Sequence, residues 1–358
     1  MNGTAESKVP ILHVSGTGPA GAGLRHRMRR HALVGMIVLG LLVIGVLIYD
    51  VAAIFLVRAE ERNTKRDPVT GIAIGAEEKT LGPEDAPGAV LFVHGFVGGS
   101  NNFADVPEAV ARRGWRVRVM RLPGHGTSPA DFARTTPDEL IEAVRAEVTA
   151  LRAKYPSVVL VGHSMGATLC TLVAAEQPVD GLILAAPYFL VTYHWYYLLP
   201  PETWVRLGAP LLPWVYKGKL FLQVNRRSSK PHIYSYTWVP ADGMKTLMEL
   251  GRRAAAPEVL GRIQCPVLLL HSPRDVAASY ESAQDAFFKM SSTTKRIIAL
   301  TKSNHHVFWD NEQEEVRDLV AFYTSSALRH EVPPDGDEPP RRRRLRDRDD
   351  RDPRRRTD

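Results

Sequence analysis

The chain has 358 residues, 44% of them hydrophobic, which is enough for one large domain with a substantial core and additional segments. The formal net charge of +7 is no evidence for a nucleic-acid-binding protein, because ten arginines and five aspartates in residues 341–358 supply +5 of it. We expect no nucleic-acid partner. Cys170 and Cys265 lie in apolar runs and are expected to be core thiols rather than a disulfide.

The N-terminal part contains a long apolar run. Residues 1–31 are rich in glycine, polar and basic residues and are expected to be disordered. Ala32–Tyr49 then runs for about 18 residues without a charge, a helix length of about 27 Å. We predict a transmembrane anchor over 32–57 and a charged linker over 58–70. A core helix would carry a polar stripe, and a signal peptide would begin closer to the terminus.

The charges around this apolar run bear on its orientation. Four basic residues flank each side, but those on the N-terminal side are more densely spaced and have no acids between them. The positive-inside rule therefore favours a single-pass membrane protein with its N-terminus inside and its catalytic domain on the outer, periplasmic or extracellular, face. The basic residues are Arg25, Arg27, Arg29 and Arg30 before the run, and Arg58, Arg62, Lys65 and Arg66 after it.

From residue 71 onward, short apolar runs alternate with helical patterns, one of which has a capping signal at Thr136. This alternation predicts an α/β fold with a mostly parallel central sheet and helices on both faces. We assign its two parts to residues 71–187 and 251–330. The expected strands are Ala89–Phe96, Trp115–Leu122, Ser157–Ser164, Gly181–Pro187, Cys265–Ser272 and Lys295–Thr301.

Two regions depart from this alternation. Residues 188–250 are crowded with aromatic side chains and are interpreted as an inserted, mainly helical cap or lid, although such residues could also belong to an ordinary core. Residues 331–358 are rich in proline, aspartate and arginine and are expected to be a disordered tail. The tail either contacts anionic lipid or stays solvated.

The stretch VLVGHSMG places Ser164 between Gly162 and Gly166, directly after an expected strand. The residues that follow, Met165–Glu176, are compatible with a helix. This G-x-S-x-G pattern is typical of a sharp strand-to-helix turn, in which the two glycines allow close approach and the strained serine projects above the sheet. Ser164 is therefore the candidate nucleophile.

A serine hydroxyl needs a base, and the base needs an orienting acid. Asp275 follows one apolar strand, and His305 and His306 follow the next. Because the ends of parallel strands meet at one edge of a sheet, these residues are expected to converge on Ser164. The residues themselves leave the two histidines as alternatives. No group of histidines and acids has a convincing metal-ligand spacing, so we predict no metal and no cofactor.

Five motifs in this order make the chain resemble the α/β-hydrolase superfamily, within it the carboxylesterase and monoacylglycerol lipase branch. The resemblance covers about Gly88 to Phe322 and implies the α/β-hydrolase fold. The motifs are HGF at 94–96, PGHG at 123–126, GHSMG at 162–166, HSPRD at 271–275 and SNHHVFWD at 303–310.

The resemblance also bears on the histidine. The carboxylesterases have the pattern S-x-H-V-I-x-x-D, and matching Ser303 and Asp310 to its ends implies that His305 is catalytic. His306 then stands at the usual valine position. Ser272 likewise stands where the family commonly has the glycine of the pattern H-G-x-x-D, a second departure from the family.

The resemblance further implies that the backbone amides of Phe96 and Met165 form an oxyanion hole. His94, Tyr188, Trp195 and Trp214 are candidate substrate-binding residues, with a purely structural loop role as the alternative for His94. The expected function is hydrolysis of carboxylic esters with an apolar acyl group, such as monoacylglycerols. The alternatives are a thioesterase, lactonase or aminopeptidase on the same fold, or a non-catalytic membrane-tethered binding protein.

Overall fold

The computed structural model describes residues 20–192, 201–218 and 222–327. The chain divides into two compact units, residues 1–53 and residues 54–358. The first unit contains most of one long helix, and the second contains the sheet and all candidate active-site residues. The predicted disordered tail lies outside the described residues.

Helix α1 spans Ala20–Asn63 and extends beyond the predicted anchor, 32–57, at both ends. The prediction that residues 20–31 are disordered is therefore corrected. These residues are helical, and their arginines, alanines and leucine are good helix formers. Residues 58–63 of the predicted linker are helical as well. The segment His26–Asn63 is long and apolar enough to cross a membrane, and a signal sequence meets the same criteria.

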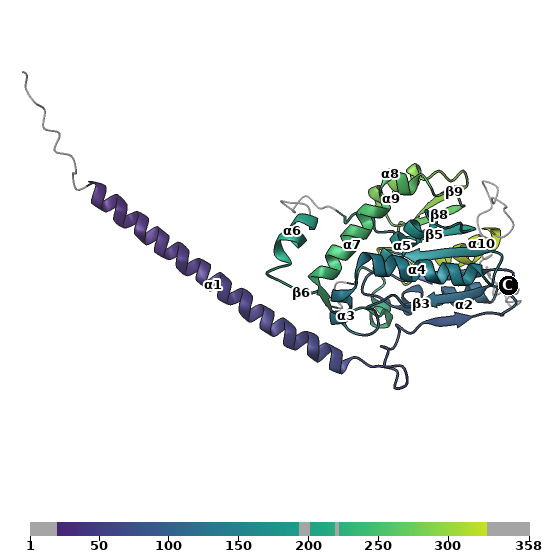
Figure 1. Cartoon of the computed structure of the whole chain (residues 1–358), viewed down its shortest axis with the longest axis horizontal. Helices are drawn as coiled ribbons and strands as arrows, with labels where there is room; N and C mark the ends of the chain where they lie inside the picture. The colour runs from purple at the N-terminus through teal and green to yellow at the C-terminus, as the bar shows by residue number, and fades with distance from the viewer. Residues whose placement is uncertain (1–19, 193–200, 219–221, 328–358) are drawn as a thin grey trace, which may run out of the picture. The chain divides into compact units, whose positions relative to one another are not determined.

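The central sheet has seven strands in the order β1-β3-β2-β4-β5-β8-β9 (Figure 1). All neighbouring pairs are parallel except β1 and β3. Parallel strands need crossover connections, which the intervening helices provide. The strands are β1 Lys79–Leu81, β2 Ala89–Val93, β3 Arg116–Met120, β4 Val158–His163, β5 Gly181–Ala185, β8 Val267–His271 and β9 Lys295–Ala299.

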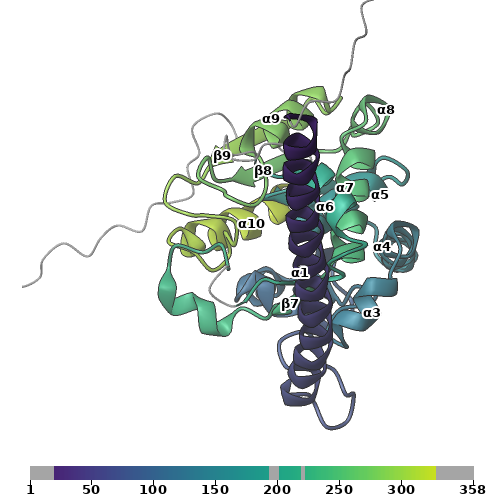
Figure 2. The ribbon, with the colours of Figure 1, turned by 90° about the vertical axis from the view of Figure 1, so that its left-hand side faces the viewer.

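Helices cover both faces of the sheet, and Figure 2 shows α10 on one side and α4 on the other. The side chains of β2 alternate between the two faces of the sheet. Leu91 and Val93 pack in the hydrophobic core on one face, with a first set of helices, and Val90 and Phe92 pack in the core on the other face, with a second set. The first set is α4 Pro137–Arg152, α5 Met165–Ala174, α7 Ala241–Ala254, α8 Pro257–Leu260 and α9 Tyr280–Lys289; the second is α2 Val106–Ala111 and α10 Gln313–Ala327.

The predicted fold class is confirmed, and so are all six predicted strands. Each strand ends earlier than expected, because the residues at its carboxyl end turn off into a loop. For example, β2 ends at Val93, and His94 to Phe96 leave the sheet. These loops lie at one edge of the sheet, which is where ligands bind in folds of this type.

The region 188–250 contains more than helices. Besides α6 (Pro201–Gly208) and a 3₁₀ helix over Arg227–His232, it contains a small antiparallel sheet that the sequence did not predict. The last helix of the region, α7, packs against α5 in the main core. The strands of the small sheet, here called the β6–β7 hairpin although a long connection joins them, are β6 Trp214–Tyr216 and β7 Trp238–Pro240. Two further short helices, Ser100–Phe103 and α3 Pro129–Arg134, lie in the loops after β2 and β3.

Candidate active site

Ser164 occupies the turn between β4 and α5 with φ 53° and ψ −119°, a backbone conformation that is rare outside glycine. The flanking glycines make this turn possible. A Cβ on Gly162 would lie 2.4 Å from Ala167 Cα, and one on Gly166 would lie 1.9 Å from the Val93 carbonyl oxygen. The predicted close approach of strand and helix is therefore confirmed.

Three buried side chains from three loops meet at this turn. The Nε2 atom of His305 lies 2.9 Å from the Ser164 Oγ, and its Nδ1 atom lies 2.7 Å from the Oδ2 of Asp275. The structure thus brings the three predicted residues together. His306 makes no hydrogen bond with Ser164 in the described part of the chain, and its ring packs instead against His163.

The protonation pattern follows from the partners. Burial acts to raise the pKa of Asp275, but its contacts with His305 and His271 hold that pKa well below the ordinary value. An ionised carboxylate only accepts hydrogen bonds, so the Nδ1 atom of His305 is the donor. The Nε2 atom of neutral His305 is then free to accept the Ser164 hydroxyl proton, as a general base would.

Two main-chain amides near Ser164 have no acceptor among the described residues, namely those of Phe96 and Met165. Met165 is the first residue of α5, where the amide has no intrahelical partner. Gly95 allows the preceding loop to approach, because a Cβ there would lie 3.1 Å from the Ser164 Cβ. Two unpaired donors beside a serine hydroxyl can stabilise a developing oxyanion.

Two buried histidines brace the loop that carries Phe96. The Nε2 atom of His94 accepts a hydrogen bond from the Leu122 amide at 3.1 Å, and the Nε2 atom of His125 accepts one from the Val97 amide at 3.2 Å. Burial lowers the pKa of His94 to about 4, and that of His125 well below its ordinary value, so both rings are neutral near pH 7.

The same contacts bear on the predicted substrate role of His94. Its ring is fully buried, and its Nδ1 atom lies 2.9 Å from the Gly95 carbonyl, so main-chain groups occupy both nitrogens. These contacts favour the structural alternative. Tyr188 is buried beside the turn, Trp214 lies half-buried on β6, and Trp195 lies outside the described residues. Substrate contact by these three stays a prediction.

Several positioning residues were missed by the sequence analysis. The Nε2 atom of His163 donates to the His305 carbonyl at 3.0 Å. The Oδ1 atom of Asn304 accepts hydrogen bonds from the His305 amide and from the Val276 amide, which links the histidine loop to the acid loop. Asp310, seen in sequence only as the end of a motif, accepts the Asn304 amide at 2.8 Å.

The region after Tyr188 is bonded to all three loops. Thr192 donates through its hydroxyl to the Asp275 carbonyl at 3.0 Å. The Asn225 amide donates to Asp310 at 2.8 Å, and the Tyr236 amide donates to the Val97 carbonyl at 3.0 Å. The predicted cap therefore contacts the loops that carry Asp275, His305 and Phe96 through both main-chain and side-chain groups.

The two cysteines are less suited than Ser164 to act as nucleophiles. Cys170 and Cys265 are free, and burial raises the pKa of Cys170 well above its ordinary value and that of Cys265 to about 12. Among the described residues, no group of three histidine, cysteine or acidic side chains is arranged to hold a metal ion. The absence of a metal or cofactor stays an expectation.

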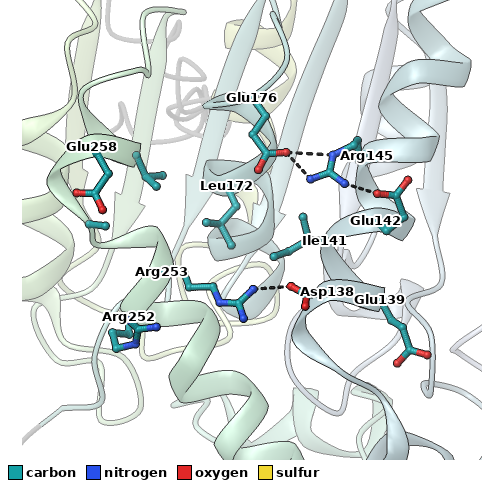
Figure 3. Close-up of a pocket in the computed structure, with 12 residues that line it drawn as sticks. Asp138, Glu139, Ile141, Glu142, Arg145, Leu172, Glu176, Arg252, Arg253 and Glu258 are labelled. Carbon is teal, nitrogen blue, oxygen red and sulfur yellow. Dashed lines mark hydrogen bonds and ion pairs between the residues drawn. The ribbon is translucent and has the colours of Figure 1, made fainter.

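A separate hollow lies between α4, α5, α7 and α8 (Figure 3). Its arginines are already paired with carboxylates: Arg145 with Glu176 and Glu142, and Arg253 with Asp138. Because these ion pairs neutralise the arginines, the hollow has little positive charge with which to bind an anionic ligand. We assign no substrate to it.

Comparison with known proteins shows the family to which this chain belongs. The family described as "Serine aminopeptidase, S33" matches residues 84–314. The chain belongs to this family. The match spans β2 to the start of α10 and includes Ser164, Asp275 and His305. The resemblance to α/β-hydrolases is therefore confirmed, and the chain is an enzyme of the serine hydrolase class.

Individual relatives agree with this family. A thermostable monoacylglycerol lipase of Bacillus sp. (strain H-257) is 29% identical over 232 residues, which are 64% of this chain and 87% of the relative. The monoglyceride lipase of Mus musculus is 25% identical over 268 residues, 70% and 85% of the two chains. The crystal structure of a monoacylglycerol lipase from Paleococcus ferrophilus has a TM-score of 0.59 at 20% identity, covers 71% of this chain and 99% of that one, and shares its fold.

Proposed function

We propose that this chain is a membrane-anchored lipase or esterase that cleaves carboxylic esters with an apolar acyl group through Ser164, Asp275 and His305. The observation that carries the proposal is the continuous chain of short contacts, 2.9 Å from the Ser164 Oγ to His305 and 2.7 Å from His305 to Asp275. Nucleophile, base and orienting acid are thus within proton-transfer distance.

The reaction proceeds in two halves. His305 takes the hydroxyl proton as Ser164 attacks the ester carbonyl, and the amides of Phe96 and Met165 hold the resulting oxyanion. The tetrahedral intermediate collapses to an acyl-enzyme, and His305 returns the proton to the leaving alcohol. Water, activated by the same histidine, then releases the carboxylic acid and restores Ser164.

The proposed substrate class rests on two observations. The named relatives described above are monoacylglycerol lipases. In addition, the predicted cap exposes several large apolar side chains within residues 204–216, and exposed apolar side chains that lie together can contact lipid or another apolar partner. These side chains are Trp204, Leu207, Leu211, Leu212, Val215 and Tyr216.

The substrate proposal is tested with the full chain in detergent micelles. We expect faster hydrolysis of medium- and long-chain monoacylglycerols than of acetyl esters, and negligible cleavage of an aminoacyl amide. Ser164→Ala should abolish both hydrolysis and labelling by a fluorophosphonate. A preference for acetyl esters or the aminoacyl amide would contradict the proposed substrate, and an active Ser164→Ala enzyme would contradict the mechanism.

The proposed location rests on helix α1, which is long and apolar enough to cross a membrane. We place the catalytic domain on the outer face because of the denser basic cluster before the apolar run. A membrane-impermeant fluorophosphonate should label intact cells as strongly as lysates, with the protein in the membrane fraction. Labelling only after lysis would reverse the orientation, and recovery in the soluble fraction would exclude the anchor.

A further inference from the structure

The carboxylate of Asp275 is more fully occupied than a triad requires. Its Oδ1 atom accepts hydrogen bonds from the amides of Ala277 and Ala278 at 2.8 and 2.9 Å. Its Oδ2 atom lies 2.7 Å from the Nδ1 atom of His305 and 3.1 Å from the Nε2 atom of His271. Two imidazole rings therefore share the one oxygen that faces the proposed base.

The role of His271 in this contact follows from its surroundings. Its Nε2 atom also lies 3.2 Å from the Ala278 carbonyl oxygen, so both neighbours of that nitrogen are acceptors. The Nε2 atom must then carry a hydrogen, which it donates toward Asp275. The ring is fully buried at the end of β8 and packs edge-on against Tyr280 with centroids 5.5 Å apart, which fixes its orientation.

We propose that His271 is a positioning residue of the triad, which orients the Asp275 carboxylate and limits the negative charge that its Oδ2 atom presents to His305. This inference rests on the proposed function. An ionised carboxylate has about four acceptor positions, and the four donors here leave it little freedom to rotate. The hydrogen bond from His271 also withdraws charge from Oδ2, so protonated His305 is stabilised less than by an unshared carboxylate.

The two histidine rings that pack against His305 do not supply a competing charge. Its ring packs against His163 and His306, with centroids 5.1 and 5.7 Å away. Burial lowers the pKa of His163 to about 3 and that of His306 well below its ordinary value, so both are neutral near pH 7. Lys217 acts electrostatically on His306. The charge on Asp275 is thus the main anionic influence on the base, and His271 is in a position to adjust it.

The test compares two substitutions with opposite hydrogen-bonding ability. His271→Phe keeps a ring against Tyr280 but removes the donor, whereas His271→Gln places an amide N–H near the position of the Nε2 atom. In His271→Phe we expect kcat to fall about 10-fold to 100-fold with little change in KM, because the acid is less well oriented. We also expect the acid limb of the pH–rate profile to move upward by about half a unit or more.

His271→Gln should restore most of kcat and the wild-type acid limb. Rates are measured on the full chain in detergent and divided by the number of sites that a fluorophosphonate titrates, so that loss of folded protein does not enter. His271→Leu is a second donor-free variant for the same comparison. An acid limb unmoved in both donor-free variants would overturn the inference. Activity that survives Ser164→Ala would instead overturn the proposed function, so the two failures are distinct.

Discussion

Buried histidines around the proposed nucleophile have different roles, set by the groups that their nitrogens meet. His305 lies between a hydroxyl and a carboxylate and can move a proton. His163 donates to a main-chain carbonyl and holds the base in place. His94 and His125 accept hydrogen bonds from main-chain amides and hold the loop that carries Phe96. Only His305 has an acceptor nitrogen that faces the hydroxyl of the proposed nucleophile. The base is therefore identified by the partners of its nitrogens and not by residue type alone.

This distinction predicts opposite results for two adjacent substitutions. His305→Ala should lower kcat by about 10⁴-fold or more, because the serine loses its base. His306→Asn should stay within about tenfold of the wild type, because His306 contributes packing rather than proton transfer. The measurement is kcat with a monoacylglycerol substrate. For His306→Asn the rate is divided by the number of active sites that a fluorophosphonate titrates. Equal losses in both variants would contradict the assignment of His305.

The approach of Gly95 to Ser164 leads to a second prediction at this scale. In Gly95→Ala the new Cβ would lie 3.1 Å from both the Ser164 Cβ and the His163 Nδ1, so these atoms and the loop must separate by a few tenths of an ångström, which we expect to displace the Phe96 amide from Ser164. We expect kcat to fall about tenfold or more with little change in the thermal midpoint. Gly208→Ala is the matched control, because nothing lies within 4 Å of its added Cβ. A kcat within twofold of wild type in Gly95→Ala would contradict this prediction.

At the scale of elements, local signals decide where helices begin. Thr136 was predicted as the N-cap of α4, and this is confirmed: its hydroxyl accepts the Glu139 amide at 3.2 Å, and the Glu139 carboxylate accepts the Thr136 amide at 2.7 Å. Such a reciprocal capping box satisfies two amides that the helix itself cannot. It requires no contact from elsewhere in the chain, which is why sequence is sufficient to find it.

Removing this cap should weaken the domain measurably. We expect Thr136→Ala to lower the free energy of unfolding by about 1 kcal/mol, because the Glu139 amide at the start of α4 loses its partner. Thr149→Ala, on the same helix, removes an exposed hydroxyl that donates to the Arg145 carbonyl and accepts from the Gln177 side chain, and it should change stability little because both contacts are open to solvent. Urea unfolding followed by tryptophan fluorescence compares the two variants. Indistinguishable midpoints would argue against the stabilising role of the capping box.

The predicted cap and the loop that carries His305 meet at Asp310, which is fully buried. Its Oδ2 atom accepts the amides of Asn225 and Asn304, both at 2.8 Å, and its Oδ1 atom accepts those of Arg226 and Asn311 at 3.0 and 2.8 Å. A buried carboxylate with four main-chain donors fixes two loops relative to each other. Because Asn304 precedes His305, this contact also orients the proposed base.

Asp310→Asn tests this junction without changing the size of the side chain. One carboxylate oxygen becomes an NH₂ group that faces two amide donors, so we expect a loss of about 2–4 kcal/mol in stability. We also expect a lower kcat per titrated site. Asp242→Asn is the control, since its exposed pair with Lys245 contributes less than about 1 kcal/mol. Stability of Asp310→Asn equal to that control would contradict the structural role.

For the whole molecule, the features that sequence predicts are those coded locally. The elbow at Ser164 needs only a strand, two glycines and a helix in succession. By contrast, the three-residue strand β1 is too short to show a period, and the β6–β7 hairpin depends on the pairing of Trp214 with Pro240 across the cap. The choice between His305 and His306 likewise depends on long-range contacts that orient the loop, so the residues alone left both open.

The buried histidines make the stability of the whole domain sensitive to acid. Burial lowers the pKa of His94 from 6.5 to about 4, and that of His163 from 6.5 to about 3. The unfolded chain therefore binds more protons than the native protein once the pH falls below about 6.5. The stability that the neutral histidines contribute is fully present above this pH. It is lost progressively as the pH falls from about 6.5 toward the pKa values of the native protein. For His94 the loss amounts to about 3 kcal/mol by pH 4.

We therefore expect urea midpoints of the full chain in micelles to change little between pH 7.5 and about 6.5 and to fall from there to pH 4.5. Asp275 does not contribute in this window: its pKa is lowered from 3.8, so the stability that it adds is present above that pH and is lost only below it. Between about pH 6 and pH 4.5, the slope of stability against pH should be smaller in His94→Gln by up to about 1.4 kcal/mol per pH unit, the value for one proton, whatever the absolute stability of the variant. Equal midpoints at pH 7.5 and 4.5, or an unchanged slope in His94→Gln, would show that these rings are not held neutral by burial.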